Sequence, residues 1–132
     1  AATWYQQATL MDPKNPQGYI KYANIYRKRS PELSVQMLEK LRTVQPDYPV
    51  DAEAGHFFYT ANRFDKAIEY FSKVDLGKFN ENYLTEYATA TYLSSDSKKS
   101  LEISQYGVQK NPRDAAMNRY VDIIPNTITI FK

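Results

Sequence analysis

The fold is decided by residues 54–71, which read AGHFFYTANRFDKAIEYF. This stretch opens with the spacing of an apolar helical face, whose members are Ala54, Phe57, Phe58 and Ala61. Asn62-Arg63 then interrupts the pattern. A second apolar face follows, made of Phe64, Ala67, Ile68 and Phe71. The stretch therefore predicts two helices joined by a tight turn.

The same pattern returns along the chain at an interval of 33 residues. One register holds proline, at Pro13, Pro46 and Pro112. A second register holds small residues, at Ala1, Ser34, Ala67 and Ser100. A third register holds tyrosine, at Tyr26, Tyr59 and Tyr92. Agreement at several independent registers predicts a true internal repeat.

The units on either side of residues 54–71 also read as two helices each. In the preceding unit, Ser30-Pro31 has the form of a helix start, a capping hydroxyl followed by proline at the first helical position. In the following unit, apolar residues mark one helix around Leu84 and another around Leu101. Because one pair of helices cannot bury its apolar face alone, we expect the units to stack into an all-α array with one continuous core.

The residues of the central stretch resemble the tetratricopeptide repeat (TPR) family, whose helix–turn–helix unit is ~34 residues long. The matching positions are the small and aromatic ones, at Gly55, Phe58, Phe64, Ala67 and Phe71. The resemblance implies a right-handed superhelical solenoid of antiparallel helix pairs, with about three repeats and a half-repeat at each end. Residues 1–11 then correspond to a lone second helix, and residues 114–124 to a lone first helix.

Some positions depart from the family pattern. Tyr22 stands where a small residue belongs, unless the first unit slips by one residue and uses Ala23. Ser104 replaces the aromatic residue seen as Phe71. After residue 124 the sequence alternates in the manner of a strand. We therefore expect a repeat domain over residues 1–124 and an extended or mobile tail over residues 125–132.

The family resemblance also implies a function, that of a non-enzymatic scaffold whose first helices line a concave groove and bind a protein or an extended peptide. Carried over through the register, the groove residues are Tyr19, Tyr26, Arg27, His56, Tyr59, Thr85, Thr89, Tyr92 and Asn118. Tyrosines at 26, 59 and 92 would form a row of rings along the groove, each supplying contact area at low entropic cost. The alternative is that these rings only pack one helix against another.

Composition argues against several other classes. A net charge of +2, with both signs interspersed, gives no electrostatic reason to expect nucleic acid or an anionic membrane. There is no cysteine, and no run approaches the ~20 apolar residues of a membrane span. His56 is the only histidine, so a histidine-based metal cluster cannot form. With no glycine-rich phosphate loop and no nucleophile turn either, we expect no catalytic residue, no metal and no cofactor.

The open ends of the array and its tyrosines also suggest partners other than a peptide. An array cut at both ends leaves apolar surface open, so we expect the chain either to belong to a longer solenoid or to self-associate through those ends. Stacked tyrosines would also suit a sugar ring, and a helical repeat of this kind could hold single-stranded RNA bases on aromatic rings. The modest net charge speaks against RNA. Carbohydrate binding and single-strand RNA binding therefore stand as alternatives to peptide binding.

Overall fold

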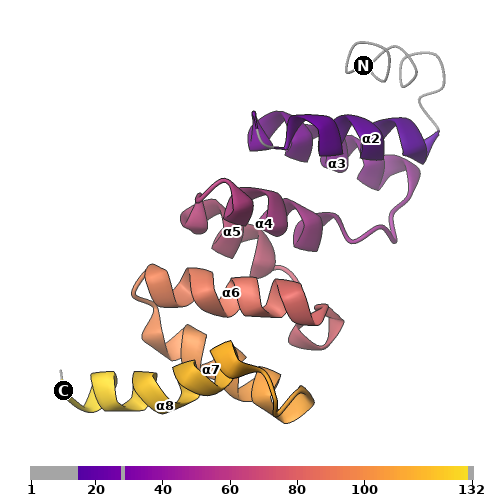
Figure 1. The fold of residues 1–132 in the computed structure, drawn as a ribbon. Helices are drawn as coiled ribbons and strands as arrows, with labels where there is room; N and C mark the ends of the chain where they lie inside the picture. The colour runs from indigo at the N-terminus through magenta and orange to yellow at the C-terminus, as the bar shows by residue number, and fades with distance from the viewer. Residues whose placement is uncertain (1–14, 28, 131–132) are drawn as a thin grey trace.

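The structure is a computed structural model. It describes residues 15–27 and 29–130, with residues 125–130 described by their backbone alone. Over these residues it is all-α (Figure 1). In chain order the elements are α2 (Pro16–Tyr26), α3 (Pro31–Val44), α4 (Val50–Thr60), α5 (Phe64–Phe71), the short 3-10 turn η1 (Leu76–Lys78), α6 (Glu81–Leu93), α7 (Ser97–Lys110) and α8 (Ala115–Ile130). The predicted all-α array of helix pairs is confirmed.

The second helix of each pair begins at a fixed place in the repeat. α3, α5 and α7 start at Pro31, Phe64 and Ser97, a constant spacing of 33 residues. At two of these starts a side chain caps the helix, because Ser30 Oγ accepts a hydrogen bond from the Leu33 N–H and Asp96 Oδ1 accepts one from the Lys99 N–H. The period and the helix start at Ser30-Pro31 are thus as the sequence predicts.

The turn inside each pair explains a departure in the first unit. In the second unit the Arg63 N–H donates to the Phe58 carbonyl at 2.8 Å, and in the third the Asp96 N–H donates to the Thr91 carbonyl at 2.9 Å. The matching bond of the first unit runs from the Ser30 N–H to the Tyr26 carbonyl at 2.8 Å, which is one residue nearer in sequence. The first turn is therefore one residue tighter than the other two.

This tighter turn shifts α2 by one residue relative to α3. Ser34 Oγ donates to the Ala23 carbonyl at 2.6 Å, eleven residues back. Ser100 Oγ donates to the Ala88 carbonyl at 2.9 Å, twelve residues back. Ala23 therefore fills the small position of the first unit, while the buried Tyr22 falls one residue before it. The slip that the sequence left open is confirmed.

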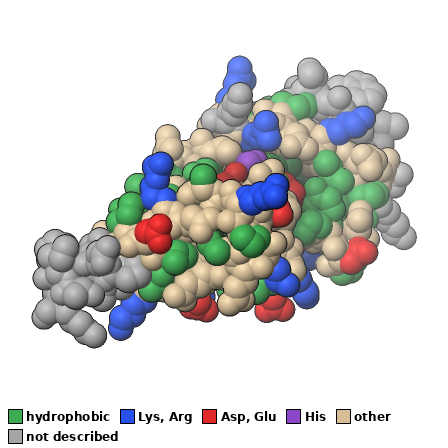
Figure 2. All heavy atoms as spheres, turned by 60° about the horizontal axis from the view of Figure 1, so that its bottom comes forward, with side chains coloured by type: hydrophobic (Ala, Val, Ile, Leu, Met, Phe, Trp, Pro, Cys, Tyr) green, Lys and Arg blue, Asp and Glu red, His purple; other side chains and the backbone are tan. Residues whose placement is uncertain are grey.

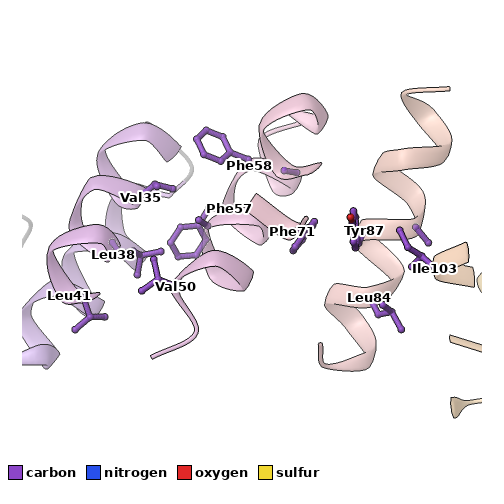
Figure 3. Close-up of a cluster of buried hydrophobic side chains, with 14 of the residues drawn as sticks. Val35, Leu38, Leu41, Val50, Phe57, Phe58, Phe71, Leu84, Tyr87 and Ile103 are labelled. Atoms are coloured by element: carbon purple, nitrogen blue, oxygen red, sulfur yellow. The ribbon is translucent and has the colours of Figure 1, made fainter. Parts of the chain in front are cut away.

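The core runs without interruption from unit to unit, as expected for stacked helix pairs. Figure 3 shows Phe57 of α4 beside Leu38 of α3 at the first junction. At the second junction Phe71 of α5 lies against Tyr87 of α6, with ring centroids 5.4 Å apart. At the last junction Met117 of α8 is 1% exposed and joins the same cluster.

One glycine permits the closest approach within a pair. A Cβ atom built on Gly55 of α4 would lie 2.5 Å from a ring atom of Phe71 on α5. Phe71 is itself 0% exposed, so its ring has no room to move aside. The small residue that the sequence places at Gly55 is therefore required by the ring opposite it.

The C-terminal part differs from the prediction. α8 continues through Pro125 to Ile130, so the expectation of an extended tail over residues 125–132 is wrong for residues 125–130. A proline lacks its own N–H and its ring crowds the carbonyl four residues earlier, but its fixed φ is itself helical, so a helix can pass through it at an energetic cost. An alternating segment also needs a neighbouring strand to pair with, and the described residues contain none. The lone second helix expected over residues 1–11 lies outside the described residues, as does Pro13.

Candidate functional site

The four first helices α2, α4, α6 and α8 lie in sequence along one side of the molecule, and α3, α5 and α7 lie behind them (Figure 1). We call the surface formed by α2, α4, α6 and α8 the first-helix face. Within it, α6 contacts both α4 and α8. The predicted groove residues lie on these four helices or, for Arg27, directly after α2.

Two hydrogen-bonded pairs cross between α4 and α6. His56 Nδ1 lies 2.8 and 2.9 Å from the two carboxylate oxygens of Glu86. In the opposite direction, the Tyr83 hydroxyl donates to the carboxylate of Glu53 at 3.0 Å. The rings of His56 and Tyr83 stack with centroids 4.5 Å apart. Burial, followed by the negative charge of Glu53, raises the pKa of Tyr83 above its usual range, so this hydroxyl keeps its proton.

Similar contacts join α6 to α8. Thr85 Oγ1 donates to Asp114 Oδ2 at 3.2 Å, just before α8 begins. The hydroxyls of Thr89 and Tyr120 share a hydrogen bond of 3.0 Å. The rings of Tyr92 and Tyr120 stack at 4.9 Å. Successive first helices are thus tied to one another by their polar and aromatic side chains.

A recess opens on this face where α2 ends beside α4. It has a volume of about 330 Å³ and is lined by Arg27, His56, Thr60 and Ala61. Arg27 is half-buried there, and the described residues offer its guanidinium no ion pair or hydrogen bond. Figure 2 shows the histidine with acidic side chains beside it, on a face where charges of both signs are scattered among hydrophobic side chains.

Several predicted groove residues do meet on this face. Arg27 and His56 share the recess, Thr85 and Thr89 lie on α6, and Tyr92 lies at the C-terminal end of that helix. Tyr59 is half-buried against Phe64, with ring centroids 5.5 Å apart, and burial followed by the charge of Glu86 raises its pKa. The tyrosine rings therefore pack against other aromatic residues and are partly exposed.

Three of the predicted residues have a different environment. Tyr19 is 7% exposed and belongs to the hydrophobic core, so its assignment to the groove surface is wrong. Because α2 is shifted by one residue, Arg27 and not Tyr26 is in register with Tyr59, and Tyr26 instead packs on Tyr22 at 4.7 Å. Asn118 Nδ2 donates to the carbonyls of Pro112 and Asp114, so its amide holds the first turn of α8.

Four side chains of the face were not predicted, namely Glu53, Tyr83, Glu86 and Tyr120. A signal for two of them was available, since Glu53 and Glu86 are 33 residues apart and thus share one register. The partners of these carboxylates, Tyr83 and His56, follow no such register. Their pairing depends on the rotation of each helix in space, and sequence spacing does not give that rotation.

The chemistry of the face is that of hydrogen bonding and aromatic contact. No cluster of three or more metal-binding side chains occurs in the described part of the chain. Over the same residues, no helix combines the length and apolar character that crossing a bilayer requires. At the recess the face offers a ligand the Arg27 guanidinium, and elsewhere it offers hydroxyls and half-buried rings.

The sequence matches no protein-family model and no curated protein. Three solved structures share the fold. YrrB, described as a TPR protein with an unusual peptide-binding site, is 19% identical with a TM-score of 0.68 over 91% of this chain and 63% of its own. The MamA protein is 13% identical with a TM-score of 0.75 over 94% of this chain and 69% of its own.

The third structure is TTC0263, a thermophilic TPR protein of Thermus thermophilus, 15% identical with a TM-score of 0.65 over 92% of this chain and 70% of its own. At these identities the likeness concerns the fold, and the chain spans less than two thirds of YrrB. Together with the helix pairs described above, these similarities show an all-α TPR solenoid.

Proposed function

We propose that this chain, which has the TPR fold, is a non-enzymatic scaffold that binds a segment of a protein partner along its first-helix face. The observation that carries the proposal is the recess lined by Arg27, His56 and Thr60, where a half-buried guanidinium has no partner among the described residues. A buried or half-buried charge is stabilised by a partner, and an incoming peptide can supply one.

The spacing of the helices suits an extended segment. Packed helices lie about 8–10 Å apart, and an extended chain advances about 3.3 Å per residue. A bound segment would therefore present about every third side chain to a new first helix. Thr60 of α4 and Thr89 of α6 supply hydroxyls at successive steps, and Tyr92 supplies a ring edge.

The face is also held in place before a ligand arrives. The bonds from His56 to Glu86 and from Thr89 to Tyr120 fix α4, α6 and α8 relative to one another. A surface that needs little rearrangement avoids part of the entropic cost of binding. YrrB is described as having a peptide-binding site, which supports the same use of this fold here.

The arrangement around His56 supports a non-enzymatic role. A histidine held by a carboxylate, as His56 is by Glu86, supplies two of the three groups of a serine-type catalytic triad, and the nucleophile is the third. The hydroxyl that shares the recess, that of Thr60, donates instead to the Phe57 carbonyl at 3.0 Å. His56 is therefore oriented by Glu86, while the hydroxyl beside it among the described recess residues is already bonded to the backbone.

The proposal can be tested with a charge-altered face and a matched control. The test variant carries Arg27→Glu and Thr60→Lys, and the control carries Lys98→Glu and Gln105→Lys on α7. Proteins captured from the source cells are quantified by mass spectrometry after circular dichroism has shown that both variants are folded. We expect the control to capture the same partners as the wild type. The test variant should capture at least about tenfold less of each, since like charges across an interface cost several kcal/mol.

Equal capture by all three proteins would contradict the proposal. So would loss from the control alone, which would place binding on the second helices.

A further inference from the structure

A second recess lies on the other side of the solenoid, between the second helices α3 and α5. Its volume is about 380 Å³, and its walls include Val35 of α3, Phe58 of α4 and Tyr70 of α5. Figure 3 shows the Phe58 ring directed toward Val35 across this space. The recess is separate from the first-helix face, because none of its lining residues is shared with the recess at Arg27.

The aromatic walls of this recess are fixed by their neighbours. The rings of Phe58 and Tyr70 stack with centroids 5.7 Å apart. The Arg63 guanidinium lies 5.8 Å from the centre of the Phe58 ring, and Lys73 Nζ lies 4.7 Å from the centre of the Tyr70 ring. Phe58 is 3% exposed, so the half-buried Tyr70 ring, fixed by Phe58 and Lys73, is the one of the two that a large apolar side chain can contact.

The charged residues at the rim are mostly paired already. Glu32 accepts a hydrogen bond from Arg63 at 2.6 Å. Glu39 pairs with Arg42 at 3.2 Å, and Lys66 pairs with Glu69 at 3.2 Å. These three pairs leave the rim with little net charge of their own.

Two polar groups at the same rim have no partner among the described residues. Lys40 is exposed and lines the recess, and the described residues offer its ammonium group no ion pair. The Tyr70 hydroxyl has no hydrogen bond to any described residue, and burial, followed by the charges of Glu39 and Glu69, raises its pKa so that it keeps its proton. Lys40 and Tyr70 both line the recess, which therefore contains a cation and a hydroxyl without a partner among the described residues.

We propose that the α3–α5 recess is a second docking site, for a protein segment in which an aromatic side chain is followed by a carboxylate. The aromatic ring packs on the half-buried Tyr70 ring, beside the edges of Val35 and Phe58, which are 4% and 3% exposed. The carboxylate binds the Lys40 ammonium and the Tyr70 hydroxyl. Charge complementarity selects this ligand, because both unpaired groups at the rim are hydrogen-bond donors and one is positive. The chain then carries two partner sites on opposite sides of the solenoid.

The probe is a short synthetic peptide with one Phe-Glu pair among glycine and serine residues, carrying a fluorophore. Two companions replace phenylalanine by alanine or glutamate by lysine. Fluorescence anisotropy gives the affinity, and methyl NMR of Val35 reports the place of binding. We expect the Phe-Glu peptide to bind and to shift the Val35 methyl signals, and each companion to bind at least about tenfold more weakly, since a charge-assisted contact contributes about 1.5–3 kcal/mol.

Variants of the protein give the second part of the test. Lys40→Glu should lower the affinity for the Phe-Glu peptide at least about tenfold. Lys98→Glu, the same change on α7, should leave that affinity unchanged. Gln36→Trp fills the recess from its exposed rim and should also abolish binding.

Several results would overturn this inference. They are no binding of the Phe-Glu peptide at millimolar concentration, equal binding of the lysine companion, or Val35 signals that do not move. The Arg27→Glu/Thr60→Lys variant should bind the peptide as the wild type does, so failure of this inference and failure of the proposed function can be told apart.

Discussion

At the scale of single residues, the fold depends on where side chains are small. Gly55 faces the ring of Phe71 within one pair, and Gly107 faces Met117 at the junction with α8, where an added Cβ would lie 3.0 Å from the methionine methyl. The two contacts differ in kind. A methionine side chain can adjust, but an enclosed phenylalanine ring cannot. Of these two glycines, Gly55 therefore has the stricter steric requirement.

Gly55→Ala should lower the free energy of unfolding. Overpacking against Phe71 costs about 1–3 kcal/mol, which exceeds the gain of about 1 kcal/mol from replacing a helical glycine by alanine. Urea unfolding followed by circular dichroism measures the difference. Gly77→Ala in η1 is the control, because its added Cβ would meet only the Tyr106 hydroxyl at 3.3 Å. A Gly55→Ala protein as stable as the wild type would show that the α4–α5 contact is looser than described.

At the scale of helices, the sequence predicted the existence of the elements well and their relative shifts poorly. The starts of α3 and α7 coincide with capping residues, and the period of 33 gives the start of α5, which has no side-chain cap. The one-residue shift of α2 follows from neither, because it arises from the backbone bond between Ser30 and Tyr26. The period of 33 alone therefore puts Tyr26 in register with Tyr59, whereas in the structure Arg27 takes that place.

The link between α4 and α6 gives a test at this scale. Tyr83→Phe removes the hydroxyl that donates to Glu53 and should lower the free energy of unfolding at neutral pH by about 1.5–3 kcal/mol, the usual range for a hydrogen bond to a charged group. Because the pKa of Tyr83 is raised in the folded state, this tyrosine contributes stability that is complete below about pH 10 and is lost as the pH rises further. The variant should therefore lose less stability than the wild type above pH 10.

Denaturant unfolding at pH 7 and across the alkaline range measures both effects. Tyr92→Phe is the matched control, since the described residues show no hydrogen bond to its hydroxyl, and it should change stability by less than about 0.5 kcal/mol at pH 7. Equal effects of the two substitutions at pH 7 would mean that the Tyr83–Glu53 bond does not help to hold α4 against α6.

At the scale of the whole molecule, the chain is a stack of helix pairs whose core continues across every junction. Repetition made this architecture predictable, since each unit carries the same apolar positions. The candidate site was less predictable, because its residues differ from unit to unit. Arg27, His56 and Thr89 were reached through the resemblance, while the partnership of His56 with Glu86 appears only when α4 and α6 are placed side by side.

The central claim is that the first-helix face holds a segment of a partner, and site-specific photocrosslinking in living source cells tests it most directly. A photoreactive phenylalanine analogue replaces Thr60, which lines the recess, or Gln105, which is exposed on α7. Crosslinks form only over a few ångströms, so an adduct reports contact at that position. The account predicts a discrete protein adduct from position 60 and none of the same mass from position 105. An adduct from position 105 alone, or none from position 60, would contradict it.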